Sequence, residues 1–132
     1  MLIIKRSDTM LKFICYPKCS TCMKAQKWLD EHSVAYEIRN IKEENPTKDE
    51  LASYLKKSGR PAAKMFNTSG LLYRSMGLKD KIGAMSEDEI LALLATDGML
   101  VKRPILVGDD FALFGFKEAE WAEKLNNDPR QK

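Results

Sequence analysis

The spacing of apolar residues predicts that the chain opens with a strand, a helix and a second strand. In 11–16 apolar side chains recur at alternate positions up to Pro17, which is typical of a strand. In 20–32 they recur at helical spacing, with charged residues on the opposite face. Alternation returns in 34–38. This order predicts a βαβ unit near the start of the chain.

Helix-start signals organise the middle of the chain. Thr47 with Glu50, and Ser86 with Glu89, have the spacing of a capping box. They predict two helices, one stopped by Gly59-Arg60-Pro61 and one ending near Gly98. Between these helices we expect short helices around the turn sequence 67–70.

The last third predicts a hairpin and a closing helix. Apolar runs at 105–107 and 111–114 flank Gly108-Asp109-Asp110, which is the pattern of two antiparallel strands with a short loop. Helical spacing follows up to Leu125. The whole order predicts an α/β fold with one four-stranded mixed sheet and helices on its faces. The plan resembles thioredoxin with a helical insertion at roughly 46–98, which we expect over one end of the sheet.

Length and composition favour one compact domain. The 132 residues are 44% hydrophobic, enough for one ordinary core, and we place it at 10–125, with an N-terminal extension at 1–9 and a polar tail at 126–132. A net charge of +3 with both signs mixed along the chain disfavours direct binding of nucleic acid. Three cysteines without a disulfide framework suit a reducing compartment, and no stretch predicts a membrane span or a signal peptide. We expect a cytoplasmic monomer.

The strongest chemical signal is Cys19-Ser20-Thr21-Cys22, at the junction of the first strand and the helix. A helix start favours an anion, so a thiol there loses its proton more easily. Cys19 is therefore the candidate nucleophile, and the helix-start amides of Thr21 and Cys22 would stabilise its thiolate. Cys22 lies within reach to resolve a mixed disulfide.

Two other interpretations of this pair stay open. Structural zinc would need two further ligands, and the chain offers only Cys15 and His32, neither with the spacing of a second ligand pair. Alternatively, the cysteines are ordinary small residues of a buried helix end. His32 itself is expected to be a solvated residue near the helix end, several turns from Cys19.

Four motifs in order carry a family resemblance over nearly the whole chain from Met10. They are Tyr16-Pro17-Lys18-Cys19-Ser20-Thr21-Cys22, Phe66-Asn67-Thr68-Ser69-Gly70-Leu71-Leu72-Tyr73-Arg74, Lys102-Arg103-Pro104-Ile105-Leu106-Val107 and Gly115-Phe116-Lys117. The sequence resembles the ArsC/Spx family. The resemblance implies a thioredoxin-like fold with a helical insertion, a nucleophilic Cys19 and a cis-proline at Pro104. It also implies two different functions: glutaredoxin-coupled arsenate reduction, and redox-sensitive control of transcription through the RNA polymerase α subunit.

Oxyanion chemistry helps to separate those functions. An arsenate site needs several fixed cations, preferably arginines, around the attacking sulfur. Of the arginines that similar enzymes carry, only Arg103 is matched here, and the other positions read Met23, Ala63 and the hairpin near 109–110. Two nearby cations could substitute: Arg60 and Lys64. The histidine that precedes the nucleophile in arsenate reductases is Cys15 here. We therefore expect weak arsenate reduction.

These observations predict a thiol–disulfide oxidoreductase that uses Cys19 and Cys22, with Arg103 stabilising the thiolate and with Thr21 and Pro104 shaping the site. We expect no bound cofactor or metal, and glutathione, a thioredoxin or a glutaredoxin as electron donor. Its partner would be a thiol or disulfide substrate or a redox protein. The alternative is a non-enzymatic, redox-sensing regulator that binds the RNA polymerase α subunit, and a third function is glutaredoxin-dependent arsenate reduction.

Overall fold

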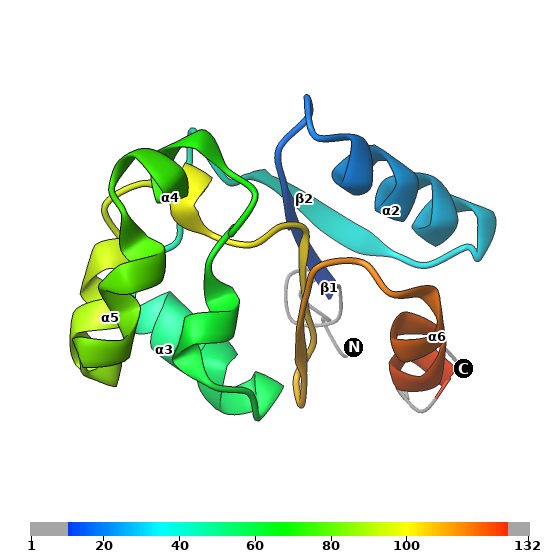
Figure 1. Cartoon of the computed structure of the whole chain (residues 1–132). Coiled ribbons are helices and arrows are strands. Elements are labelled where there is room, and N and C mark those ends of the chain that lie inside the picture. Colours follow the sequence, from blue (N-terminus) through cyan, green and yellow to red (C-terminus); the bar gives the residue numbers. More distant parts are fainter. Residues whose placement is uncertain (1–10, 127–132) are drawn as a thin grey trace.

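The computed structural model describes residues 11–126, and its elements follow the predicted order (Figure 1). The helices and strands are β1 (Leu11–Cys15), α2 (Ser20–Glu31), β2 (Tyr36–Asn40), α3 (Lys48–Ser58), α4 (Leu71–Ser75), α5 (Glu87–Leu94), β3 (Ile105–Val107), β4 (Ala112–Phe114) and α6 (Glu118–Asn126). Short 3-10 turns join the helices between β2 and β3. The α/β class and the four-stranded mixed sheet are confirmed.

The strands lie in the order β2-β1-β3-β4. β1 pairs parallel with β2 and antiparallel with β3, and β4 pairs antiparallel with β3. Ile14 is opposite Ile105, which is opposite Phe114. The end of β1, the start of β3 and the end of β4 therefore meet at one edge of the sheet, where the chain continues into the cysteine motif.

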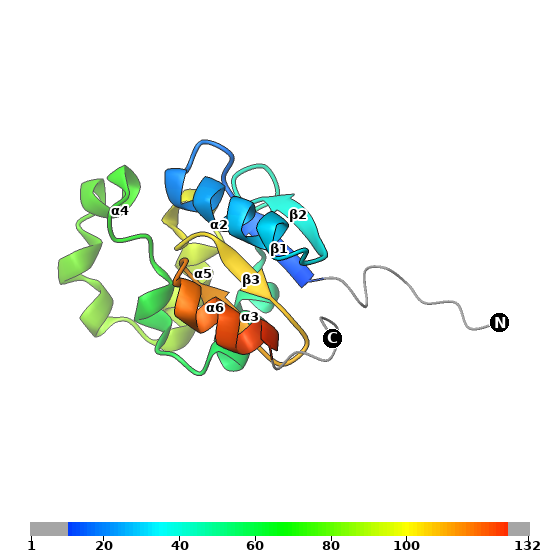
Figure 2. The same ribbon diagram turned by 90° about the vertical axis from the view of Figure 1, so that its right-hand side faces the viewer.

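Helices cover both faces of the sheet (Figures 1 and 2). Phe13 and Cys15 pack in a core cluster with α2 and α6, whereas Ile14 packs in a second cluster with α3 and α5. The helices α3 and α5 of the insertion pack on the second face of the sheet, against Ile14, Ile105 and Phe114. Buried residues of β1 lie on both faces, Phe13 and Cys15 on one and Ile14 on the other, so each face needs helices packed against it.

Both predicted capping boxes form. The side chain of Thr47 accepts a hydrogen bond from the Glu50 amide at the start of α3, and Ser86 does the same with Glu89 at the start of α5. α3 ends at Ser58, and its C-cap Gly59 takes the left-handed conformation with φ 67° that glycine adopts without a steric cost. α5 ends at Leu94, short of the predicted end near Gly98, because Asp97 caps a separate 3-10 turn over Gly98–Leu100.

The boundary between the domain and the polar tail is also corrected. α6 runs through Asn126, which had been assigned to the polar tail, because the helix continues one residue beyond the last apolar contact at Leu125. The predicted extension 1–9, with Met10, and the rest of the tail lie outside the described residues. Within 11–126, no helix is long and apolar enough to cross a membrane.

Candidate functional site

Three thiols gather where β1 leads into α2. Cys15 is the last residue of β1, Cys19 is the N-cap of α2, and Cys22 lies in the first turn of that helix. All three are free thiols. Cys15 and Cys22 are each only 2% exposed, whereas Cys19 is partly exposed. Among these thiols, Cys19 is therefore the one that a substrate reaches first.

The thiols contact one another through Cys22. Its side chain forms hydrogen-bonding contacts with the side chains of both Cys15 and Cys19. The backbone amide of Tyr16 also donates a hydrogen bond to Cys22 Sγ over 3.3 Å. The predicted pair Cys19 and Cys22 is thus brought together, and Cys15 joins it from the adjacent strand.

The helix start at Cys19 is left open. Cys19 has extended backbone angles, and its side chain makes no capping hydrogen bond. Its carbonyl accepts from the Met23 amide, which begins the regular helical bonding. The amides of the first turn have no partner within a helix, and they define the place where an anion at Cys19 is favoured.

Cys22 is chemically different from Cys19. Its hydrogen bond with the Cys15 side chain and its burial raise the pKa of the Cys22 thiol far above the ordinary value. Cys22 is therefore a neutral thiol near neutral pH, which fits a residue that reacts after the exposed one.

Arg103 and Pro104 stand at the same edge of the sheet. The Arg103–Pro104 peptide bond is cis, as the family resemblance implied, and the Pro104 carbonyl accepts a 2.8 Å hydrogen bond from the Gly115 amide. The Arg103 guanidinium lies over the Tyr16 ring at 5.5 Å, and its Nη1 is 3.4 Å from the Met99 carbonyl. These contacts are with neighbours of the thiols, so stabilisation of the Cys19 thiolate by Arg103 stays a prediction.

A cavity of about 280 Å³ adjoins this edge. Thr21 and Arg103 both line it, although Cys19 does not. Its other lining residues are two lysines, several small polar residues, three phenylalanines and a glycine: Lys102, Lys117, Asn67, Thr68, Ser69, Phe66, Phe114, Phe116 and Gly115. The lining contains three cations and no carboxylate, so the cavity favours a ligand with negative charge.

The sequence interpretation missed Lys102 and Lys117 as site residues. Both belong to motifs quoted for the family resemblance, and the hairpin register sets these motifs side by side, because the Gly115 amide bonds to the Pro104 carbonyl. Gly115 has φ 81°, and a Cβ there would lie 2.8 Å from Lys102 Cε. This glycine therefore lets Lys102 cross the strand end. The predicted hairpin pairs the two motifs, but no local pattern marks their lysines as cavity residues.

The cations proposed as substitutes do not join the cavity. Arg60 forms an ion pair with Glu120 of α6. Lys64 is exposed and does not line the cavity. The hairpin loop at 109–110 lies at the opposite edge of the sheet, because β3 runs antiparallel to β1. Arg103 is thus the single arginine among the residues that line the cavity.

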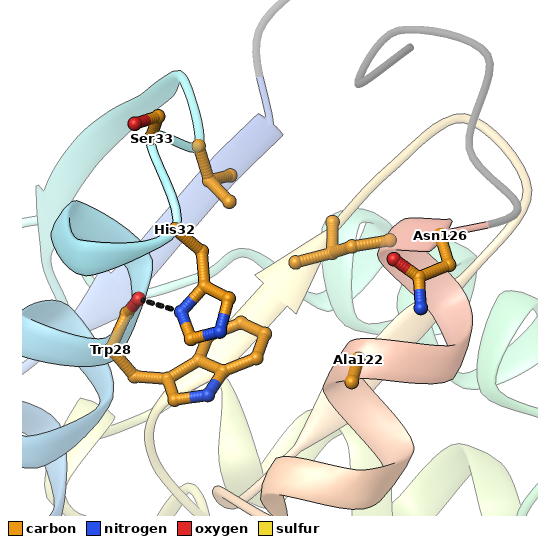
Figure 3. Close-up of a pocket in the computed structure, with 7 residues that line it drawn as sticks. Trp28, His32, Ser33, Ala122 and Asn126 are labelled. Carbon is orange, nitrogen blue, oxygen red and sulfur yellow. Dashed lines mark hydrogen bonds between the residues drawn. The ribbon is translucent and has the colours of Figure 1, made fainter.

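His32 lies at the far end of α2 from Cys19, about 20 Å away at a rise of about 1.5 Å per residue. Its Nδ1 is 2.8 Å from the Trp28 carbonyl, and its ring stacks on Trp28 with centroids 4.1 Å apart, at the mouth of a second cavity between α2 and α6 (Figure 3). The expectation of an exposed residue at the helix end is confirmed. Among residues 11–126, no three histidine, cysteine or acidic side chains are placed to hold a metal ion.

Comparison with known proteins identifies the family. The model of the ArsC family matches residues 15–124, so the chain belongs to this family. The uncharacterized protein YusI of Bacillus subtilis is 50% identical over 113 residues, which cover 86% of this chain and 96% of that protein. The global transcriptional regulator Spx 2 of Bacillus cereus is 29% identical over 102 residues, covering 77% of this chain and 76% of that protein.

Solved structures agree with the fold. An ArsC-family-related protein from Bacteroides fragilis superposes with a TM-score of 0.84 at 49% identity, covering 86% of this chain and 95% of that one. A protein from Streptococcus mutans, described as a possible arsenate reductase, gives a TM-score of 0.80 at 43% identity over 87% of this chain and 98% of that one. The resemblance to the ArsC/Spx family and the thioredoxin-like fold are thereby confirmed.

Proposed function

We propose that this chain is a thiol–disulfide oxidoreductase in which Cys19 attacks and Cys22 resolves. The observation that carries the proposal is the asymmetry of the pair. Cys19 is partly exposed at the open start of α2, and it contacts a buried Cys22 whose pKa is raised. An accessible nucleophile beside a protected thiol is the arrangement that such exchange needs.

The reaction balances without a bound cofactor. The Cys19 thiolate attacks one sulfur of a substrate disulfide, and the other sulfur leaves as a thiolate that takes a proton. Cys22, once deprotonated, attacks Cys19 Sγ, which forms the Cys19–Cys22 disulfide and releases the second substrate thiol. The substrate disulfide is reduced by two electrons and the protein dithiol is oxidised. Glutathione, a thioredoxin or a glutaredoxin would restore the dithiol.

The cavity favours an anionic substrate. Arg103 Nε is buried without a hydrogen-bond partner among the described residues, and Lys102 and Lys117 line the same cavity. A carboxylate would satisfy such donors. A disulfide of a small carboxylate-bearing thiol, such as glutathione, therefore fits the charge of the cavity. We place this chemistry in a cytoplasmic monomer.

Trapping the intermediate tests the proposal. The Cys22→Ser variant is incubated with glutathione disulfide and mapped by mass spectrometry after acid quenching. We expect a mixed disulfide that accumulates on Cys19, because the resolving thiol is gone. Cys19→Ser is the matched control and should carry no adduct. An adduct on Cys15, or none in either variant, would contradict the assignment of Cys19.

The second candidate is a redox-sensing regulator, favoured by the relative named global transcriptional regulator Spx 2. In this case the Cys19–Cys22 disulfide would change the affinity for the RNA polymerase α subunit. Immobilised protein, reduced or oxidised, is exposed to purified α subunit. Retention of the α subunit that depends on the redox state would favour the regulator. No retention in either state would favour the oxidoreductase.

Arsenate reduction is the third candidate, and the structure of a protein described as a possible arsenate reductase is its support. The cavity offers a single arginine, and lysine is a poorer match to a tetrahedral oxyanion. We expect little turnover of arsenate with glutathione and glutaredoxin. Turnover like that of an authentic arsenate reductase, lost in Arg103→Ala, would favour this candidate instead.

A further inference from the structure

Cys15 is a buried thiol that the proposed reaction does not use. It is 2% exposed, it ends the central strand β1, and its carbonyl accepts a 2.8 Å hydrogen bond from the Ile41 amide. The sheet therefore fixes its backbone. Its side chain points to the face that α2 covers, because Cys15 shares a core cluster with Cys22 and Ala25.

Two observations place Cys15 against Cys22. The side chains form a hydrogen bond. Independently, the Tyr16 amide, which is bonded directly to Cys15, donates to Cys22 Sγ over 3.3 Å. Because an amide nitrogen lies about 2.4 Å from the preceding Cα, Cys22 Sγ is within about 6 Å of the Cys15 Cα. Cys22 thus has a thiol partner on each side, one at the surface and one in the core.

We propose that Cys15 is a third redox thiol, which moves the disulfide from Cys19–Cys22 at the surface to Cys15–Cys22 in the core. This step rests on the proposed oxidoreductase function, which supplies the first disulfide. The Cys15 thiolate attacks Cys22 Sγ, so the Cys15–Cys22 bond forms and the Cys19–Cys22 bond breaks. The electron pair leaves with Cys19 Sγ, and Cys19 takes up one proton for the one that Cys15 lost. No further oxidant or reductant is consumed.

The direction of this exchange has a physical reason. The departing sulfur carries a negative charge until it is protonated, and Cys19 is the partly exposed thiol at the uncapped start of α2, where water reaches it. The neutral disulfide then occupies the apolar core, where solvent does not reach it. The oxidised protein would regain a free thiol at Cys19 while it keeps the Cys15–Cys22 disulfide in the core.

Labelling the oxidised native protein tests this step. Wild type is oxidised with glutathione disulfide, freed from the reagent, treated briefly with iodoacetamide under native conditions, quenched in acid and mapped. We expect a fraction that carries the label on Cys19 together with a Cys15–Cys22 disulfide. Cys15→Ser and Cys15→Ala should lower labelling of Cys19 at least about tenfold, because the Cys19–Cys22 disulfide then leaves no exposed thiol. Circular dichroism of both variants establishes that they fold.

The outcomes separate the two proposals. If oxidised wild type maps only to Cys19–Cys22 and takes no label, the migration is overturned and the oxidoreductase stands. If all three cysteines stay reduced under conditions that oxidise thioredoxin-like dithiols, the oxidoreductase and the migration both fall. Label on Cys19 without any Cys15–Cys22 disulfide also overturns the migration.

Discussion

The start of α2 differs from the starts of α3 and α5 in both capping and charge. α3 and α5 each begin with a complete capping box and carry acidic residues in the first turn. α2 begins at Cys19 without a side-chain cap, and its first turn has no acidic residue. Carboxylates and capping oxygens satisfy the amides and the dipole of a helix start. The helix-start amides of α3 and α5 are thus already satisfied, whereas the start of α2 stays available to an anion that forms or binds there during the reaction.

The largest effect is expected when α2 receives a serine N-cap, which is the residue that caps α5. Cys19→Ser should abolish disulfide reduction, at least about 10³-fold, because no other thiol is accessible. Stability should not fall, and it should rise by up to about 1 kcal/mol, because serine is a good N-cap. Reduction of a small disulfide and urea unfolding measure the two effects. Substantial remaining activity would show that another cysteine attacks.

The cations beside this open helix start give the next effect. Arg103→Ala should raise the KM for an anionic disulfide about tenfold, since a charge-assisted hydrogen bond is worth about 1.5–3 kcal/mol. The KM for a neutral disulfide should stay unchanged, because such a substrate offers no charge to Arg103. Lys64→Ala is the matched control, because Lys64 is exposed and lies outside the cavity. Equal losses with anionic and neutral disulfides would mean that Arg103 does not bind the substrate.

The capping glutamates of α3 and α5 differ in one respect, which is an ion pair with an arginine. Arg39 of β2 forms a bidentate pair with Glu50 of α3, with nitrogen–oxygen distances of 2.7 and 2.9 Å, whereas Glu89 occupies the same capping position in α5 without such a partner. The hydrogen bond from Arg39 lowers the pKa of Glu50 from 4.5 to about 2. Its contribution is therefore present above pH 4.5 and is lost as the pH falls toward 2.

Glu50→Gln should accordingly lower the free energy of unfolding near pH 7 by about 1–2 kcal/mol, after allowance for solvent screening of a partly exposed pair. It should also flatten the loss of stability between pH 4.5 and 2. Glu89→Gln keeps a capping amide and should change less. Denaturant unfolding across this pH range checks both variants, and matched acid behaviour of the two would refute a special role for Arg39.

Removing the caps themselves gives the smallest effect. Thr47→Ala and Ser86→Ala should each cost about 1 kcal/mol of stability without changing disulfide reduction, because these helices lie on the face of the sheet away from α2. Thermal unfolding and the reduction assay measure the two quantities. A change in activity of either variant would couple the insertion to the site.

Most elements of the fold could be predicted from local sequence signals. The capping boxes at Thr47 and Ser86, the hairpin around Gly108 and the helical spacing after Cys19 depend on neighbours a few residues apart, so they can be found in the chain. The placement of the insertion could not be found in this way. It depended on β1 being central and buried on both faces, which strand pairing decides.

The candidate site likewise has features that local sequence predicts and features that only tertiary packing creates. By itself the sequence determined the thiol pair at a helix start and, through its resemblance to a family, the cis bond before Pro104, because both are carried by short contiguous motifs. Only the tertiary structure decided that Cys15 contacts Cys22, that Lys102 and Lys117 join Arg103 around one cavity, and that Arg60 pairs elsewhere. The reason is physical: the register of strands and the packing of helices bring together residues that lie far apart in the chain, and no local pattern encodes those distances.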